Sequence, residues 1–261
     1  MNKPYWGLWA LLLVAFVFFV ILSFWQDGIS VGGLDIKTAT FARDMMNDPA
    51  GKRAEALDTL DSEGHAKSWR VPMDTTAKNI LFIGDSMLEG LAPRLASYCD
   101  KNGHTLVEVI WYSSSTKCWG ETARLTELIN KFHPDYIFVC LGANELYVPG
   151  IKTARRPYLK KILAEIGDIP YVWIGPPNWD EDTGINDLLA RELGKGCFYL
   201  SAKDKFERSR DGAHPTRASA QKWMDRVIKW IGAHGAHPIR LDYPGEGIAR
   251  ASRIVIYQPP V

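Results

Sequence analysis

The chain has 261 residues, of which 46% are hydrophobic, and its formal net charge is +1. This length suits one large domain, or one domain with appended segments, and the hydrophobic content excludes general disorder. The near-neutral charge and the lack of any Lys- and Arg-rich run exclude the electrostatic pattern of a nucleic-acid-binding protein.

Residues 6–25 form an apolar run without a single charged side chain, and Trp residues lie near both of its ends. Because a helix rises about 1.5 Å per residue, such a run matches the roughly 30 Å hydrocarbon layer of a bilayer. A cleaved signal peptide is the alternative, but its apolar region is normally shorter and ends in small residues, which residues 23–26 do not supply. We therefore predict a transmembrane anchor within residues 1–26.

The charges that flank this run favour one orientation in the membrane. Lys3 and the N-terminal amine precede the run, and Asp27 follows it closely, which favours an N-terminus inside and the remaining chain outside. We therefore predict a single-pass protein of a bacterial inner membrane whose larger part is periplasmic or otherwise extracytoplasmic. Residues 27–77 follow as a tether, with a helical pattern over residues 38–60.

Apolar runs alternate with helical patterns from residue 79 onward. The apolar runs predict five strands: Asn79–Ile83, Thr105–Tyr112, Tyr136–Leu141, Tyr171–Ile174 and Cys197–Leu200. The intervening patterns predict five helices: residues 86–102, 121–132, 156–166, 186–193 and 216–231. Continuous apolar character suits strands that are buried on both faces, and the strand–helix rhythm predicts right-handed crossovers. We predict an α/β domain over residues 78–233, with a flavodoxin-like, doubly wound, five-stranded parallel sheet.

The remaining residues, 234–261, read as a C-terminal extension that wraps the surface and adds one further strand over Arg253–Tyr257. The four cysteines are predicted to be unpaired, since two of them fall within apolar strands and the others at opposite ends of the sheet. Their spacing also misses the common zinc patterns. The scattered histidines show no ligand spacing either, so no metal and no cofactor is expected.

Ser86 lies in the sequence Gly84-Asp85-Ser86, directly after the first predicted strand and at the start of a helix. This position lifts the hydroxyl above the carboxyl edge of the sheet, where an open α/β sheet places its reactive groups. The N–H groups of a helix N-terminus also point at any anion that forms there. Ser86 is therefore a candidate nucleophile; the alternative is a simple helix N-cap.

Asp211 and His214 lie three residues apart in a loop that precedes a predicted helix. One short turn brings both side chains to the sheet edge that carries Ser86, where His214 can take the hydroxyl proton and Asp211 can hold the imidazole tautomer. The alternative is an ordinary Asp–Gly turn before a helix. Asn144 ends the third strand, where its amide can donate to a developing oxyanion; the alternative there is a turn residue.

These motifs, taken in their order along the chain, resemble the conserved blocks of the SGNH hydrolases, which are also called GDSL-type esterases and lipases. The matching segments are Ile83-Gly84-Asp85-Ser86, Gly142-Ala143-Asn144-Glu145 and Asp211-Gly212-Ala213-His214-Pro215. The resemblance implies that Ser86 is the nucleophile, His214 the base with Asp211 as its partner, and Asn144 an oxyanion donor. The N–H of Ser86 is the expected first donor of the same oxyanion hole.

The family's second block needs a glycine after the second strand, and Gly120 is the glycine that this segment offers. The resemblance therefore implies Gly120 as an oxyanion donor, with the backbone of Ser115 or Thr116 as the alternative. The chain also carries Glu145 where the family usually has Asp. Trp119, Tyr147 and Trp179 fall near loops at the predicted rim, where aromatic rings can stack on a sugar; the alternative is that they pack in the core.

The implied reaction is acyl transfer through an acyl-enzyme. The anchor and the aromatic loops favour a carbohydrate O-acetylesterase, acting on an ester of a cell-envelope or extracellular glycan. One alternative is an O-acetyltransferase that moves acetyl onto a polysaccharide or peptidoglycan, in which case a membrane acyltransferase is the expected partner. An alternative of another class is a non-catalytic envelope scaffold that keeps the SGNH shell.

Overall fold

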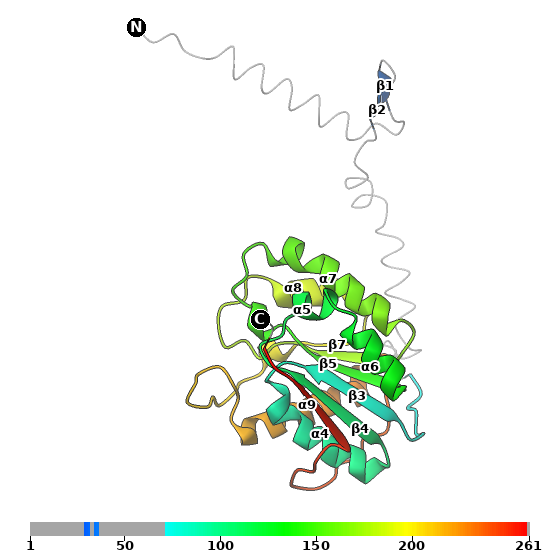
Figure 1. The fold of residues 1–261 in the computed structure, drawn as a ribbon, viewed down its shortest axis with the longest axis vertical. Coiled ribbons are helices and arrows are strands. Elements are labelled where there is room, and N and C mark those ends of the chain that lie inside the picture. Colours follow the sequence, from blue (N-terminus) through cyan, green and yellow to red (C-terminus); the bar gives the residue numbers. More distant parts are fainter. Residues whose placement is uncertain (1–28, 32–33, 37–70, 260–261) are drawn as a thin grey trace, which may run out of the picture. The chain divides into compact units, whose positions relative to one another are not determined.

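The computed structural model describes residues 29–31, 34–36 and 71–259, and the chain divides into two compact units at residues 68 and 69 (Figure 1). In the first unit, β1 (Ile29–Val31) and β2 (Leu34–Ile36) pair antiparallel. The predicted anchor at residues 6–25 and the helical pattern at residues 38–60 lie outside the described residues. No helix in the described ranges combines the length and the apolar character that a membrane crossing needs.

A six-stranded parallel sheet forms the centre of the second unit. Its strands are β3 (Asn79–Gly84), β4 (Thr105–Trp111), β5 (Tyr136–Cys140), β6 (Tyr171–Ile174), β7 (Phe198–Tyr199) and β8 (Arg253–Tyr257). They lie in the order β7-β6-β5-β3-β4-β8, and every neighbouring pair is parallel. The first five strands thus follow the order 2-1-3-4-5 of flavodoxin-like sheets, which confirms the predicted α/β class.

The prediction of five strands is wrong, because β8 joins the same sheet as a sixth strand. It pairs with β4 from Val107↔Arg253 to Trp111↔Tyr257, so it satisfies the backbone groups of what would otherwise be an edge strand. A parallel partner needs a long connection, and residues 235–252 supply it beneath α4. The buried Arg94 of α4 holds this connection by donating to the carbonyls of Gly245 and Gly247, at 2.8 Å each.

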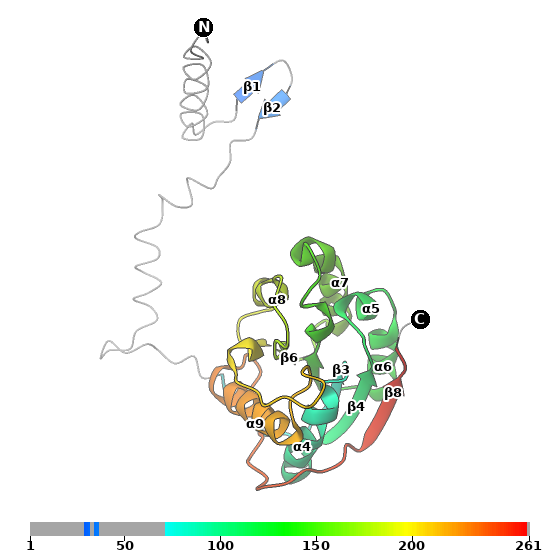
Figure 2. The same ribbon diagram turned by 90° about the vertical axis from the view of Figure 1, so that its left-hand side faces the viewer.

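Helices cover both faces of the sheet (Figure 2). One face packs against α4 (Leu88–Asn102) and α9 (Arg217–His234). The other face packs against α5 (Thr116–Gly120), α6 (Arg124–Phe132), α7 (Ile151–Ile166) and α8 (Ile185–Glu192). Two short 3-10 helices, η1 (Ala143–Glu145) and η2 (Ser201–Lys203), follow β5 and β7. The central strands are buried on both sides, as their continuous apolar character predicts.

Candidate active site

Ser86 lies in the tight turn between the end of β3 and the start of α4. Gly84 makes this turn possible, because a Cβ at that position would lie 2.3 Å from Leu88 Cδ1 and 2.4 Å from the carbonyl oxygen of Cys140. The next residue, Asp85, is buried and accepts the N–H of Met87 at 2.9 Å. The turn therefore fixes the backbone on both sides of Ser86 and leaves its hydroxyl at the carboxyl edge of the sheet.

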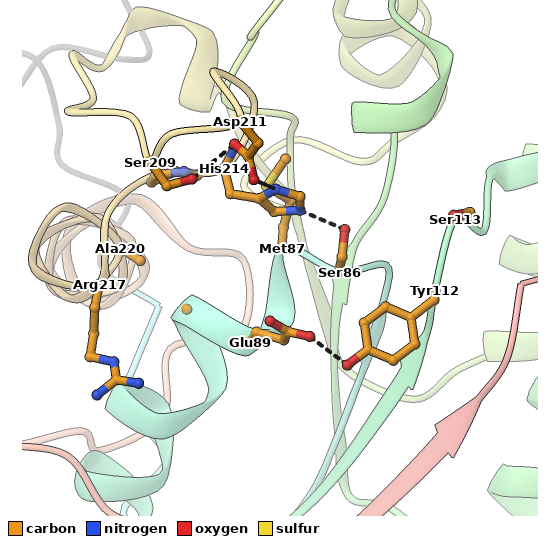
Figure 3. A pocket seen from close by; sticks show the side chains of 12 residues that line it. Ser86, Met87, Glu89, Tyr112, Ser113, Ser209, Asp211, His214, Arg217 and Ala220 are labelled. Carbon is orange, nitrogen blue, oxygen red and sulfur yellow. Dashed lines mark hydrogen bonds and ion pairs between the residues drawn. The ribbon is translucent and has the colours of Figure 1, made fainter.

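The structure brings Ser86, His214 and Asp211 into one hydrogen-bonded line (Figure 3). The Oγ of Ser86 lies 2.8 Å from Nε2 of His214, and Nδ1 of His214 lies 2.8 Å from Oδ2 of Asp211. A carboxylate can only accept, so the hydrogen atom of the second bond is on Nδ1. In the neutral imidazole this leaves Nε2 as the acceptor for the Ser86 hydroxyl, which is the tautomer that a general base needs.

Asp211 is held in place by its own loop. Its Oδ1 accepts the N–H groups of Ala213 and His214 at 2.9 Å each and the hydroxyl of Ser209 at 2.8 Å. The hydrogen bonds from the backbone and the ring of His214 lower the pKa of the Asp211 carboxyl well below its ordinary value. Asp211 is therefore ionised near neutral pH, and its exposure to water favours the same charged form.

Arg208 ties this loop to the rest of the molecule, and sequence reasoning missed it. Its guanidinium donates to the carbonyl of Ala213 at 2.6 Å, to that of Asn178 at 3.0 Å and to that of Pro177. The loop with Asp211 and His214 is thereby fastened to the segment that follows β6. Nothing in the local sequence marks this role, because an Arg in a polar loop is usually a solvated surface charge.

Asn144 lies in η1, at the end of β5, close to the turn that carries Ser86. Its Nδ2 donates to the carbonyl of Ser114 at 2.9 Å and lies 3.4 Å from Oδ2 of Asp85. The first bond fixes the amide, while the second is long and leaves one N–H available for a stronger acceptor. Burial raises the pKa of the neighbouring Asp85 carboxyl to about 7, so much of that carboxyl is protonated near neutral pH.

Gly120 does not line the cavity at Ser86, so the structure does not support the expectation that it donates to an oxyanion. It is the last residue of α5, and a Cβ there would lie 2.7 Å from the Cα and the carbonyl oxygen of Tyr158 in α7. The glycine therefore serves helix packing. The backbone of Thr116, one of the alternatives to Gly120 as an oxyanion donor, is not available either, since its N–H donates to Glu145.

Ser113, and not Gly120, lines the cavity together with the predicted nucleophile Ser86. It follows β4, lines the same cavity as Ser86, and lies on the opposite side of Ser86 from His214 (Figure 3). Its φ is 55°, in the left-handed region that glycine usually occupies. No hydrogen bond within the described part of the chain uses the N–H of Ser86 or Ser113. The sequence carries no signal for this, because a serine rarely adopts that conformation.

The three aromatic residues predicted to bind substrate lie in different environments: one is buried in the core, and the other two form a pair nearer the surface. Trp119 is fully buried and its Nε1 donates to Ser114 Oγ at 3.1 Å, so it is a core residue and the expectation is corrected. Tyr147 is 57% exposed and packs edge-on against Trp179, with ring centroids 6.4 Å apart. Trp179 donates to the carbonyl of Ala143 at 2.9 Å, which places this pair beside Asn144.

A cavity of about 550 Å³ opens at the three aligned side chains. Its walls come from the starts of α4 and α9 and from the end of β4, and they include Glu89, Tyr112, Ser113 and Arg217 (Figure 3). The Tyr112 hydroxyl donates to Glu89 within the cavity wall. The walls combine these polar and charged side chains with the apolar Met87, Pro215 and Ala220. In the described ranges, no three His, Cys, Asp or Glu residues are grouped to hold a metal.

Searches with this chain found similar folds among solved structures. The psychrotrophic esterase EstA of a Pseudoalteromonas species, in a structure inhibited by monoethylphosphonate, aligns with a TM-score of 0.43 and 15% identity over 59% of this chain and 96% of that chain. TesA aligns with a TM-score of 0.44 and 18% identity over 59% and 97%. A lipase/acylhydrolase from Enterococcus faecalis aligns with a TM-score of 0.45 and 16% identity over 59% and 95%.

No family model and no curated protein matches the chain. The identities and TM-scores of the three solved structures are low.

Proposed function

We propose that the chain is a serine esterase of the SGNH type that acts through an acyl-enzyme. The observation that carries this proposal is the continuous line of hydrogen bonds from Ser86 Oγ through His214 to Asp211, at 2.8 Å for each step, at the mouth of a cavity. A nucleophile, a base and a group that orients the base are what acyl transfer to serine requires.

In this mechanism the Ser86 oxygen attacks the ester carbonyl carbon while its proton passes to Nε2 of His214. The carbonyl oxygen becomes an oxyanion that accepts the N–H groups of Ser86 and Ser113 and the amide of Asn144. His214 then gives its proton to the leaving alkoxide as the carbon–oxygen bond breaks. Water then attacks the acyl carbon as it gives a proton to His214. His214 returns this proton to Ser86 Oγ as the bond between Oγ and the acyl group breaks and the acid leaves.

The substrate class that we propose is an O-acetylated carbohydrate of the cell envelope or the extracellular space. Glu89, Tyr112 and Arg217 in the cavity wall can exchange hydrogen bonds with sugar hydroxyls. The exposed Tyr147 with Trp179 offers aromatic faces of the kind that sugars stack on. The charge-free run at residues 6–25 supports an envelope location, with an anchor in a bacterial inner membrane and the esterase domain outside it. An O-acetyltransferase, served by a membrane acyltransferase, would use the same groups with a sugar hydroxyl in place of water.

The decisive experiment is labelling of the purified chain with a fluorophosphonate probe, followed by peptide mapping and by acetyl-ester hydrolysis. We expect label on Ser86 alone, none on Ser86→Ala, and strongly slowed labelling of His214→Ala. The exposed Ser252 provides the matched control, and Ser252→Ala should label like the parent. If Ser86 stays unlabelled in a folded chain, the alternative of a non-catalytic envelope scaffold would be favoured. An acetylated glycan formed from a donor ester would favour the transferase.

A further inference from the structure

Glu145 is a fully buried carboxylate that the proposed reaction does not use. It directly follows Asn144 in η1, and its side chain is 0% exposed. Three donors meet it: Arg155 Nε at 2.6 Å, Thr116 N–H at 2.7 Å and the Thr116 hydroxyl at 2.9 Å. Burying a carboxylate away from water costs free energy unless the carboxylate is paired and hydrogen-bonded. Arg155 and Thr116 supply this pairing and hydrogen bonding to Glu145.

The donors come from two different helices. The side chain of Glu145 fixes both helices relative to the neighbouring Asn144. Thr116 is the first residue of α5, immediately after the loop that contains Ser113. Arg155 lies in α7, on the other side of the carboxylate. Glu145 thus joins η1 to the β4–α5 loop and to α7 in one charge-assisted cluster.

A second hydrogen bond joins η1 to the same β4–α5 loop. The amide of Asn144 donates to the carbonyl of Ser114, two residues before the Thr116 that donates to Glu145. The loop and η1 are therefore cross-linked twice, once through each of two consecutive side chains. Two cross-links fix both the separation and the relative rotation of the segments, whereas one alone would permit a hinge motion.

We infer that Glu145, held by Arg155, is a positioning residue that sets the distance between the two halves of the oxyanion hole, the N–H of Ser113 and the amide of Asn144. This inference rests on the proposed esterase function. Oxyanion donors act only when they are placed where the negative charge develops, so a small displacement of the loop weakens both donors together. The glutamate, in place of a shorter aspartate, has the reach to meet α5 and α7 at once.

The test measures kcat and KM for acetyl-ester hydrolysis by the full chain and its Glu145→Gln, Glu145→Asp and Arg155→Met variants. A displacement of about 1 Å can cost on the order of 10²-fold in rate, so we expect Glu145→Gln to lower kcat by that order with KM nearly unchanged. Glu145→Asp keeps the charge but not the reach to both helices, so it should also lower kcat with KM nearly unchanged. The matched control is Lys152→Met, which breaks the exposed ion pair of α7 with Asp187 and should leave kcat unchanged.

A double-mutant cycle separates positioning from general stability. In an Asn144→Ala background the oxyanion hole is already impaired, so Glu145→Gln should then cost far less than it does in the parent. Equal losses in both backgrounds would overturn the inference, as would a folded Glu145→Gln with unchanged kcat. If Glu145→Gln does not fold, Arg155→Met and Glu145→Asp are put through the same cycle. A parent chain that neither labels nor hydrolyses esters would refute the esterase proposal itself, which is a different result.

Discussion

At the scale of single residues, the site depends on backbone conformation as much as on side-chain chemistry. Ser113 holds φ at 55°, and a non-glycine residue pays about 1–2 kcal/mol to stay in that region. The turn is closed by the N–H of Ser114, which donates to the carbonyl of Trp111 at 3.1 Å. Strain of this kind persists where surrounding structure over-determines it, often beside reactive groups. Ser113 lies in the cavity wall, and no hydrogen bond among the described residues uses its N–H.

Asn144 provides the sharpest prediction at this scale. Asn144→Ala removes a proposed oxyanion donor and its bond to the Ser114 carbonyl. Loss of one oxyanion donor typically costs about 10²–10³-fold in kcat. We expect that loss in kcat for acetyl esters, with a much smaller change in KM, because the donor acts mainly on the transition state. Steady-state kinetics on the purified chain measure both parameters.

The control for this prediction is the exposed Asn130 of α6, where the same substitution should leave kcat and KM unchanged. Retained turnover in Asn144→Ala would remove Asn144 from the oxyanion hole and leave the backbone donors alone.

At the scale of elements, the packing of α5 against α7 is set by a glycine. Gly120→Ala would push a methyl group to 2.7 Å from backbone atoms of Tyr158, which can move only if the helices separate. Overpacking of this kind typically costs about 1–3 kcal/mol in the free energy of unfolding. We therefore expect Gly120→Ala to lower the denaturation midpoint, as followed by circular dichroism, while the labelling of Ser86 persists in the folded fraction.

The matched control is Gly232→Ala in α9, where the nearest atom to the new methyl group is Met73 Cε at 3.9 Å. An alanine inside a helix is favoured over glycine, so that variant should be as stable as the parent or more stable. A Gly120→Ala chain of unchanged stability would mean that α5 and α7 pack less closely than the structure has them.

The sequence predicts most elements of the central sheet, because long apolar runs between helices have few other interpretations. It does not predict α5, since the polar segment before Trp119 is typical of a loop. One available signal was Ser115, whose Oγ accepts the N–H of Cys118 as a helix N-cap does. The helix predicted over residues 156–166 begins too late, since α7 starts at Ile151 and accommodates Pro157 inside the helix.

The candidate triad is predictable because Ser86, Asp211 and His214 follow a distinctive order and spacing. The roles of Gly120 and Trp119 are not, since a position in a loop does not tell whether a residue faces the rim or the core. Trp119 faces inward and finds a partner for its indole N–H in Ser114. Ser113 carries no sequence signal, because a serine rarely adopts a positive φ. Arg208 carries none because its contacts join segments that are distant in the chain.

At the scale of the whole molecule, buried acids link stability to pH. Burial raises the pKa of Asp85 from 3.8 to about 7, and burial raises that of Glu108 from 4.5 to about 7. The folded chain therefore keeps protons that the unfolded chain releases between these values. Because the folded state binds more protons there, its stability is greatest at the acidic end of this window and falls as the pH rises toward neutrality.

Asp85→Asn tests this linkage with little change in shape, since the amide oxygen can still accept the N–H of Met87. Each titrating group contributes a slope of about 1.4 kcal/mol per pH unit within its window. The free energy of unfolding, from urea titrations at several pH values between about 4 and 7, should fall more steeply for the parent than for Asp85→Asn. The free energy of unfolding of Asp85→Asn should therefore rise relative to that of the parent as the pH rises.

The control replaces the exposed Asp100 of α4 with Asn, and the pH dependence of its stability should match that of the parent. Parallel curves for the parent and Asp85→Asn would mean that Asp85 is ionised in the folded state and that the amide of Asn144 faces a full negative charge.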